Sequence, residues 1–309
     1  MKVTFQADSS SDLAALQIGE YLKFTDVRVR YLSGAGISRL KTWGRLRGAV
    51  LGVNLTSTNE HRVEGSAVMV APGVALCASH VFQGHLDRLM SGELKALCIG
   101  PSDHGNELWG LRGINFVPNT DVCILTLTLI NGLPTDRTFH HASITTRTPR
   151  HGERLFVVAF KAEAEDCENW VEGRQIRMNA LICAGEVTQH FLLGRDRVML
   201  PGPAIEVECD SWPGMSGGPV FDDEGWLIGV LSSSVSGEHH DSPSFVSLAI
   251  SALGHRFTGG WPDPGSHVIR SLLSMSGKGC HVERPESIVA SYPDDGASTK
   301  YVYTIWQTR

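Results

Sequence analysis

Residues 209–219 read CDSWPGMSGGP, and this stretch is the most informative in the 309-residue sequence. Glycines 214, 217 and 218 surround Ser216, and the apolar run PVF begins directly afterwards at Pro219. An ordinary turn needs one or two glycines, which supply backbone conformations with positive φ. Three glycines around one serine are typical of a hydroxyl held on a tight turn, with backbone N–H groups open to a ligand. The stretch therefore predicts a nucleophilic serine at position 216.

A serine nucleophile needs a base, and the base needs a carboxylate that orients it. Two residues elsewhere in the chain fit these roles. His80 closes the apolar run VALCASH at 74–80, and Asp121 directly precedes the apolar run VCILTL. The order along the chain is therefore histidine, aspartate, serine, with each residue next to a predicted strand.

These motifs resemble those of the trypsin-like (chymotrypsin-fold) serine proteases, in particular bacterial intracellular members. GMSGGP at 214–219 resembles the family's GxSGGP, LCASH at 76–80 resembles its TAAH, and DVCIL at 121–125 resembles its D-I-A-L-L. The resemblance covers roughly residues 48–257. It implies an all-β fold of two six-stranded antiparallel β-barrels.

The strand pattern by itself favours an all-β fold. Short apolar runs separated by turn signals form two successive sets, one over 48–146 and one over 150–257. Such spacing is typical of β-barrels or β-sandwiches. We therefore predict an N-terminal extension (1–47, a short helix plus a strand), a protease domain (48–257, with barrels at about 48–146 and 147–257) and a C-terminal appendage (258–309). In the appendage, residues 267–276 are predicted as a helix and residues 300–306 as a strand.

The resemblance also implies a role for each site residue. Ser216 would attack the scissile carbonyl, His80 would take its proton, and Asp121 would fix the imidazole. The N–H groups of Gly214 and Ser216 would form the oxyanion hole. The implied substrate-binding residues are Asp210, Trp212, Ser232, Ser233 and Ser234.

The preference for the residue before the scissile bond stays open at this point. Asp210 lies six positions before Ser216, where digestive trypsins carry an aspartate that selects lysine or arginine. The sequence favours a basic residue there, with small apolar and acidic residues as the alternatives. Met215 departs from the digestive members, which have an aspartate that pairs with a newly cut N-terminus. We therefore expect an active site that forms without cleavage after Arg47.

Composition restricts the partners and the compartment. A net charge of −6 gives no reason to expect a nucleic-acid partner, and the sequence has no run of 18 apolar residues for a membrane span. No motif pairs the seven cysteines, and no apolar run follows Lys2 as in a secretory signal. These features predict a soluble, cytoplasmic protein. We expect no cofactor and no metal, because the adjacent His239 and His240 are typical of a surface loop.

The sequence thus predicts a serine endopeptidase that works through an acyl-enzyme. It would be a regulated intracellular effector with few protein targets, and a regulatory protein partner would bind through the extensions. Two other readings stay open. One is a catalytically silent or inhibited pseudoprotease that serves as a protein-binding module. The other is a protease that cuts only itself or a companion protein.

Overall fold

The computed structural model describes most of the chain. The described residues are 24–31, 46, 48–57, 61–102, 105–130, 140–161, 169–170, 173–174, 176–209, 211–234, 243–259, 268–291 and 300–303. The short helix predicted in the N-terminal extension lies outside these residues.

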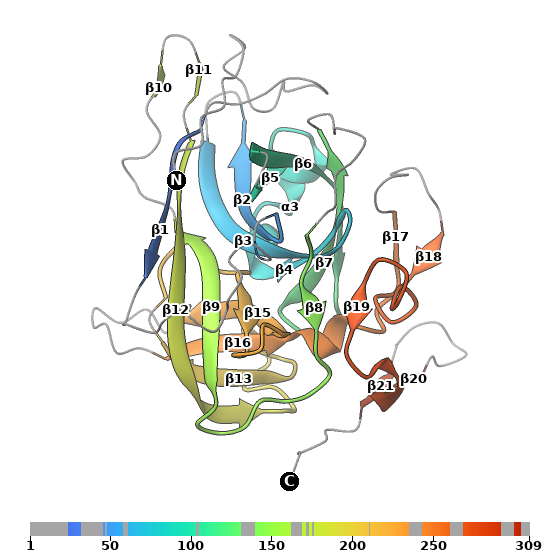
Figure 1. The fold of residues 1–309 in the computed structure, drawn as a ribbon. Coiled ribbons are helices and arrows are strands. Elements are labelled where there is room, and N and C mark those ends of the chain that lie inside the picture. Colours follow the sequence, from blue (N-terminus) through green and yellow to red (C-terminus); the bar gives the residue numbers. More distant parts are fainter. Residues whose placement is uncertain are drawn as a thin grey trace.

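The first half of the chain forms a closed barrel of six antiparallel strands (Figure 1). Its strands are β2 (Val50–Thr56), β3 (His61–Ala71), β4 (Val74–Ala78), β5 (Lys95–Ser102), β6 (Gly105–Phe116) and β7 (Val122–Leu129), which pair around the barrel in the order β2-β3-β4-β7-β6-β5. Alternate side chains point inward, as the two-residue period of a strand requires. Leu51, Val53 and Leu55 of β2, for example, all belong to the buried cluster that includes Trp109. Gly73 closes the predicted β3–β4 turn with a φ of 69°.

The second half forms another ring of six antiparallel strands. They are β9 (Arg154–Lys161), β12 (Ile176–Phe191), β13 (Ala204–Glu208), β14 (Pro219–Phe221), β15 (Leu227–Ser234) and β16 (Ser244–Leu248). They pair in the order β14-β9-β12-β13-β16-β15, and a β14–β15 pairing closes the ring. The prediction of two six-stranded antiparallel barrels is confirmed.

Further strands extend the second barrel. Strand β8 (Ser143–Ile144) pairs in parallel with β15, and β19 (His281–Val282) pairs in parallel with β8. Near the N-terminus, β1 (Phe24–Tyr31) pairs in parallel with β12. The two-stranded pairs are β10 (Asn169–Trp170) with β11 (Gly173–Arg174), β17 (Phe257–Thr258) with β18 (Ile269–Arg270), and β20 (Ile288–Ser291) with β21 (Lys300–Tyr303). The helices are short: α2 (His80–Gln83), α3 (Leu86–Met90), and the 3-10 turns η2 (Ala249–Ala252) and η3 (Pro285–Ser287).

The helix predicted over residues 267–276 is wrong. Near the start of that range, Ile269 and Arg270 form strand β18, and the chain then turns. Serine side chains compete with helical hydrogen bonds, and here Ser271 and Ser274 exchange hydrogen bonds between hydroxyl and backbone N–H. Within the described ranges, no helix has the length and apolar character that a membrane span needs.

Candidate active site

His80 and Asp121 are brought together by the pairing of strands β4 and β7. The register places Ala78 opposite Val122, so the residues just beyond these strand ends are neighbours. The His80 backbone N–H donates to Asp121 Oδ1 over 3.0 Å, and His80 Nδ1 lies 2.8 Å from Asp121 Oδ2. A carboxylate only accepts, so this contact places the ring proton on Nδ1 and leaves Nε2 as an acceptor. The His80 side chain is 33% exposed and that of Asp121 only 7%, so the imidazole can meet a ligand while its carboxylate stays dry.

Ser232 connects this pair to Ser216. Its buried hydroxyl donates to Asp121 Oδ2, and its backbone carbonyl accepts a 3.5 Å hydrogen bond from Ser216 Oγ. The Asp121 carboxylate therefore accepts three hydrogen bonds, from the backbone N–H of His80, from Nδ1 of His80 and from the Ser232 hydroxyl. In the described part of the chain, no hydrogen bond joins Ser216 Oγ to His80. A 3.5 Å contact is at the weak limit of a hydrogen bond, so the Ser216 hydroxyl can exchange it for a better acceptor.

The Ser216 turn has the backbone that its glycines predict. Gly214 has a φ of 88° and Gly217 a φ of 82°. The Met215 N–H donates to Trp212 O over 3.0 Å, and with proline second and glycine third this is typical of a type II turn. Buried Met215 also accepts the Trp212 N–H at its sulfur, over 3.3 Å. The methionine thus stabilises the turn from inside, where digestive members have an aspartate.

Ser66 of β3 clamps this turn onto the first barrel. Its N–H donates to Ser216 O over 2.7 Å, and its hydroxyl donates to Gly214 O over 3.1 Å. The approach leaves no room for a side chain at Gly217, where a Cβ would lie 2.1 Å from Ser66 O and 2.6 Å from Cys77 Sγ. Cys77 belongs to β4, the strand that leads to His80. The turn is therefore held at the seam between the two barrels.

Two backbone donors of the turn have no protein acceptor among the described residues. They are the N–H groups of Gly214 and Ser216, whereas the N–H groups of Met215, Gly217 and Gly218 all donate to backbone carbonyls. Two neighbouring open N–H groups beside a hydroxyl are what an oxyanion would bind. Their positions are the two that the sequence analysis named for the oxyanion hole.

The structure describes Trp212, Ser233 and Ser234, three of the other residues expected to contact substrate. Trp212 is half-buried and packs against the main apolar core. Ser233 and Ser234 continue strand β15, opposite Phe245 and Ser244 of β16. Asp210 lies outside the described residues. Over the same described ranges, no three His, Cys, Asp or Glu side chains gather in a way that could hold a metal ion.

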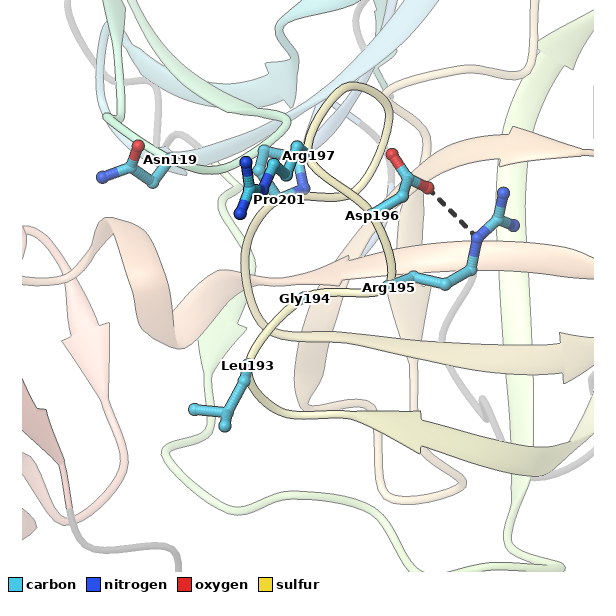
Figure 2. A pocket seen from close by; sticks show the side chains of 7 residues that line it. All are labelled: Asn119, Leu193, Gly194, Arg195, Asp196, Arg197 and Pro201. Atoms are coloured by element: carbon cyan, nitrogen blue, oxygen red, sulfur yellow. Dashed lines mark hydrogen bonds and ion pairs between the residues drawn. The ribbon is translucent and has the colours of Figure 1, made fainter.

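A hollow of about 500 Å³ borders the turn that carries Asp121 (Figure 2). Asn119 of that turn lines one side, and the β12–β13 loop lines the other with Leu193, Gly194, Arg195, Asp196, Arg197 and Pro201. The loop is well held, because Asp196 Oδ1 accepts the N–H groups of Val198 and Met199, and these bonds lower the pKa of its carboxyl. The sequence analysis did not single out this loop, because no motif marks it.

The comparisons with known proteins concern the family and the fold of this chain. The family model of the trypsin-like peptidase domain matches residues 65–230, more than half of the chain. No curated protein matches the sequence. Among solved structures, the active form of the Rv3671c protease from M. tuberculosis has a TM-score of 0.52 at 14% identity, with 78% of this chain and 91% of that chain covered. Deg5 gives 0.48 at 16% identity, covering 67% and 86%. The MamO protease domain from Magnetospirillum magneticum gives 0.43 at 18%, covering 67% and 95%.

Sequence identities of 14–18% show a shared fold and nothing more. Of these three structures, only the Rv3671c protease has a TM-score above 0.5. The family match is the stronger finding. It begins at Gly65 in strand β3 and ends at Val230 in strand β15, so it includes His80, Asp121 and Ser216. The chain belongs to the family of trypsin-like peptidases and is a serine peptidase.

Proposed function

We propose that the chain is a serine endopeptidase in which Ser216, His80 and Asp121 act as the catalytic triad. Ser216 Oγ attacks the scissile carbonyl while His80 Nε2 takes its proton. The imidazolium is stabilised by Asp121, and it then protonates the leaving amine. A water molecule then attacks the acyl-enzyme carbonyl while His80 Nε2 takes its proton. The imidazolium returns the proton to Ser216 Oγ, and the carboxylic acid product leaves. The observation that carries this proposal is the single hydrogen-bonded chain from His80 through Asp121 and Ser232 to Ser216.

The open N–H groups of Gly214 and Ser216 support the second half of the mechanism. They would bind the oxygen of the tetrahedral intermediate, where losing one donor typically costs about 100- to 1000-fold in rate. Ser216 needs only to turn about its Cα–Cβ bond to leave the carbonyl of Ser232. Gly65 packs closely against both catalytic segments: a Cβ there would lie 2.8 Å from Ser216 O and 2.9 Å from the side chain of Val81, the residue after His80.

A fluorophosphonate probe tests the proposal directly, because it reacts only with an activated serine. Wild-type protein should be labelled at Ser216, and Ser216→Ala should remove the label. His80→Ala should slow labelling by about a thousandfold or more. Ser91→Ala, which changes an exposed turn serine, is the control and should label like the wild type. Labelling that persists in Ser216→Ala would overturn the assignment.

One observation favours a second candidate function, an inhibited protease that serves as a protein-binding module. In this structure the Ser216 hydroxyl bonds to Ser232 O, and among the described residues it has no bond to His80. A wild-type protein that stays unlabelled under every condition, including with candidate partners, would support this second function. A regulated effector protease with few targets fits two observations. One is the hydrogen-bonded chain from His80 through Asp121 and Ser232 to Ser216, and the other is the lack, among the described residues, of a bond between Ser216 Oγ and His80.

The compartment and the partners of the protease are proposals of the same kind. We infer a cytoplasmic protein, since Cys77 and Cys123 lie opposite each other on β4 and β7 and yet are both free thiols. A regulatory partner would act through the terminal segments, because these attach to the second barrel by β1 and β19. The preference for a basic residue before the scissile bond still rests on Asp210 in the sequence alone.

A further inference from the structure

A groove of about 950 Å³ opens on the first barrel, between the single-turn helix α3 and strands β5 and β6. Helix α3 contributes Leu86 and Leu89, and strand β6 contributes Leu111, Ile114 and Phe116. The volume falls within the range of about 300–1,000 Å³ that small-molecule sites occupy, and barrel mouths are a frequent location of such sites. The catalytic residues His80, Asp121 and Ser216 are not part of its lining.

Several apolar side chains of the groove, on α3 and β6, are only partly covered by the protein. No residue of α3 is buried, and Met90 at its end is 85% exposed. On β6, Leu111, Ile114 and Phe116 pack against the barrel core but keep part of their surface accessible. An apolar surface of this kind, next to polar residues, marks a site where a ligand can bury it.

The charged residues that line the groove are both cations. They are Lys95 of β5 and Arg112 of β6, and the lining includes no aspartate or glutamate, although the whole chain carries a net charge of −6. The pairing of β5 with β6 ends at Leu97 and Gly110, and Lys95 and Arg112 each lie two residues beyond that last pair. Among the described residues, Arg112 makes one hydrogen bond, from Nε to Thr128 Oγ1 over 3.0 Å, and no ion pair. Its guanidinium therefore has donors left for an anion.

The barrel excludes a peptide strand as the occupant. Strand β5 pairs with β2 and β6, and β6 pairs with β5 and β7, so neither has a free edge to which a peptide could add. A peptide backbone pressed against Leu89 and Phe116 would leave its N–H and C=O groups without partners, which is costly in an apolar site. A hydrocarbon chain carries no such groups.

We propose that this groove binds a free long-chain fatty acid. The alkyl chain lies against Leu89, Ile114 and Phe116, and the carboxylate lies at the guanidinium of Arg112. Charge-assisted hydrogen bonds from a guanidinium suit a carboxylate well. The inference does not depend on catalysis, although α3 directly follows the segment α2 that begins with His80.

Calorimetric titration of the full-length protein with octanoate, decanoate and dodecanoate, each below its micelle concentration, tests the proposal. We expect saturable binding of one molecule, with affinity that rises roughly fourfold for each added methylene, the ratio expected when one methylene leaves water. Dodecanol should bind more weakly than dodecanoate, and dodecyltrimethylammonium should not bind. Absence of saturable binding, equal binding of all three head groups, or tighter binding of an apolar tetrapeptide would overturn the proposal.

Variants then locate the site. Arg112→Glu should weaken dodecanoate binding by about fivefold or more, since an exposed ion pair becomes a repulsion. Leu89→Glu should abolish binding, because it places a carboxylate on the apolar wall. Lys278→Glu makes the same charge change on an exposed residue outside the groove and should bind like the wild type. Circular dichroism and the thermal midpoint show whether each variant is folded. Folded Arg112→Glu and Leu89→Glu proteins with wild-type affinity would contradict the assigned site.

Discussion

Replacing Ser66 by alanine tests the seam between the barrels, because one small side chain joins three segments there. Ser66 Oγ accepts the Phe160 N–H of β9 over 2.8 Å and donates to Gly214 O over 3.1 Å, and the residue is fully buried. Ser66→Ala would leave a buried N–H without a partner and a carbonyl without its donor. An unsatisfied buried group costs about 1–3 kcal/mol, so we expect the free energy of unfolding to fall by about 2–4 kcal/mol.

The same substitution should slow the reaction at Ser216. Gly214 O would lose its anchor, and the turn that presents the N–H groups of Gly214 and Ser216 would be less firmly held. We expect fluorophosphonate labelling to slow by up to about 100-fold, the lower range for one lost oxyanion donor. Urea denaturation and labelling rates measure the two effects on the same protein.

Ser251→Ala is the matched control, because Ser251 is also buried but its hydroxyl only donates to Leu248 O within a 3-10 turn. It should cost about 1 kcal/mol and leave the labelling rate unchanged. A Ser66→Ala protein as stable as the Ser251→Ala protein, with an unchanged labelling rate, would refute the idea that Ser66 holds the turn.

Three other predictions concern the turn, an ion-pair cluster and the dependence of stability on pH. Gly217→Ala should destabilise the protein and abolish labelling, because its Cβ would lie 2.1 Å from Ser66 O at a φ of 82°; denaturation and labelling check this, and a fully active variant would contradict it. Arg147→Met should lower the free energy of unfolding by roughly 1–3 kcal/mol, since it removes the cation 2.5 Å from the carboxylate of Asp222, which is 1% exposed, while Arg147 itself is 30% exposed. His141 and His255 are half-buried, and desolvation lowers the pKa of both below the ordinary value near 6.5. The unfolded state therefore binds their protons first, so the stability they contribute is present above about pH 6.5 and is lost as the pH falls. Urea midpoints at pH 7 and pH 5 should differ less when both histidines are glutamine, and an unchanged difference would reject this assignment.

The barrels could be predicted because their signals are local. Short apolar runs and turns such as Pro72–Gly73 repeat along the sequence, and each reports on a few neighbouring residues. The glycines around Ser216 are equally local, since the positive φ of Gly214 and Gly217 follows from the residue type. The division into extension, protease domain and appendage stays a prediction, as do the roles of the triad residues.

Long-range contacts could not be predicted in the same way. Ser66 looks like any small polar residue in a strand, and its importance depends on Phe160 and Gly214, which are 94 and 148 positions away in the sequence. The direction of the Ser216 hydroxyl is a matter of one side-chain rotation, which no motif encodes. The helix predicted over 267–276 failed for the opposite reason, because its serines favour local turns that an apolar pattern does not reveal.

The position of β1 has a consequence for anyone who shortens this protein. Residues 27–31 follow the edge of β12 from Met178 to Ile182, next to the part of β12 that β13 covers from Glu186 onward. A polypeptide that begins at Gly48 keeps both barrels but loses β1, so it would present this edge of β12 as a row of unpaired amide groups to solvent. Bare edges of this kind recruit strands from other molecules. Trimmed material should therefore self-associate, and poor solution behaviour would then reflect a missing neighbour rather than a badly folded enzyme.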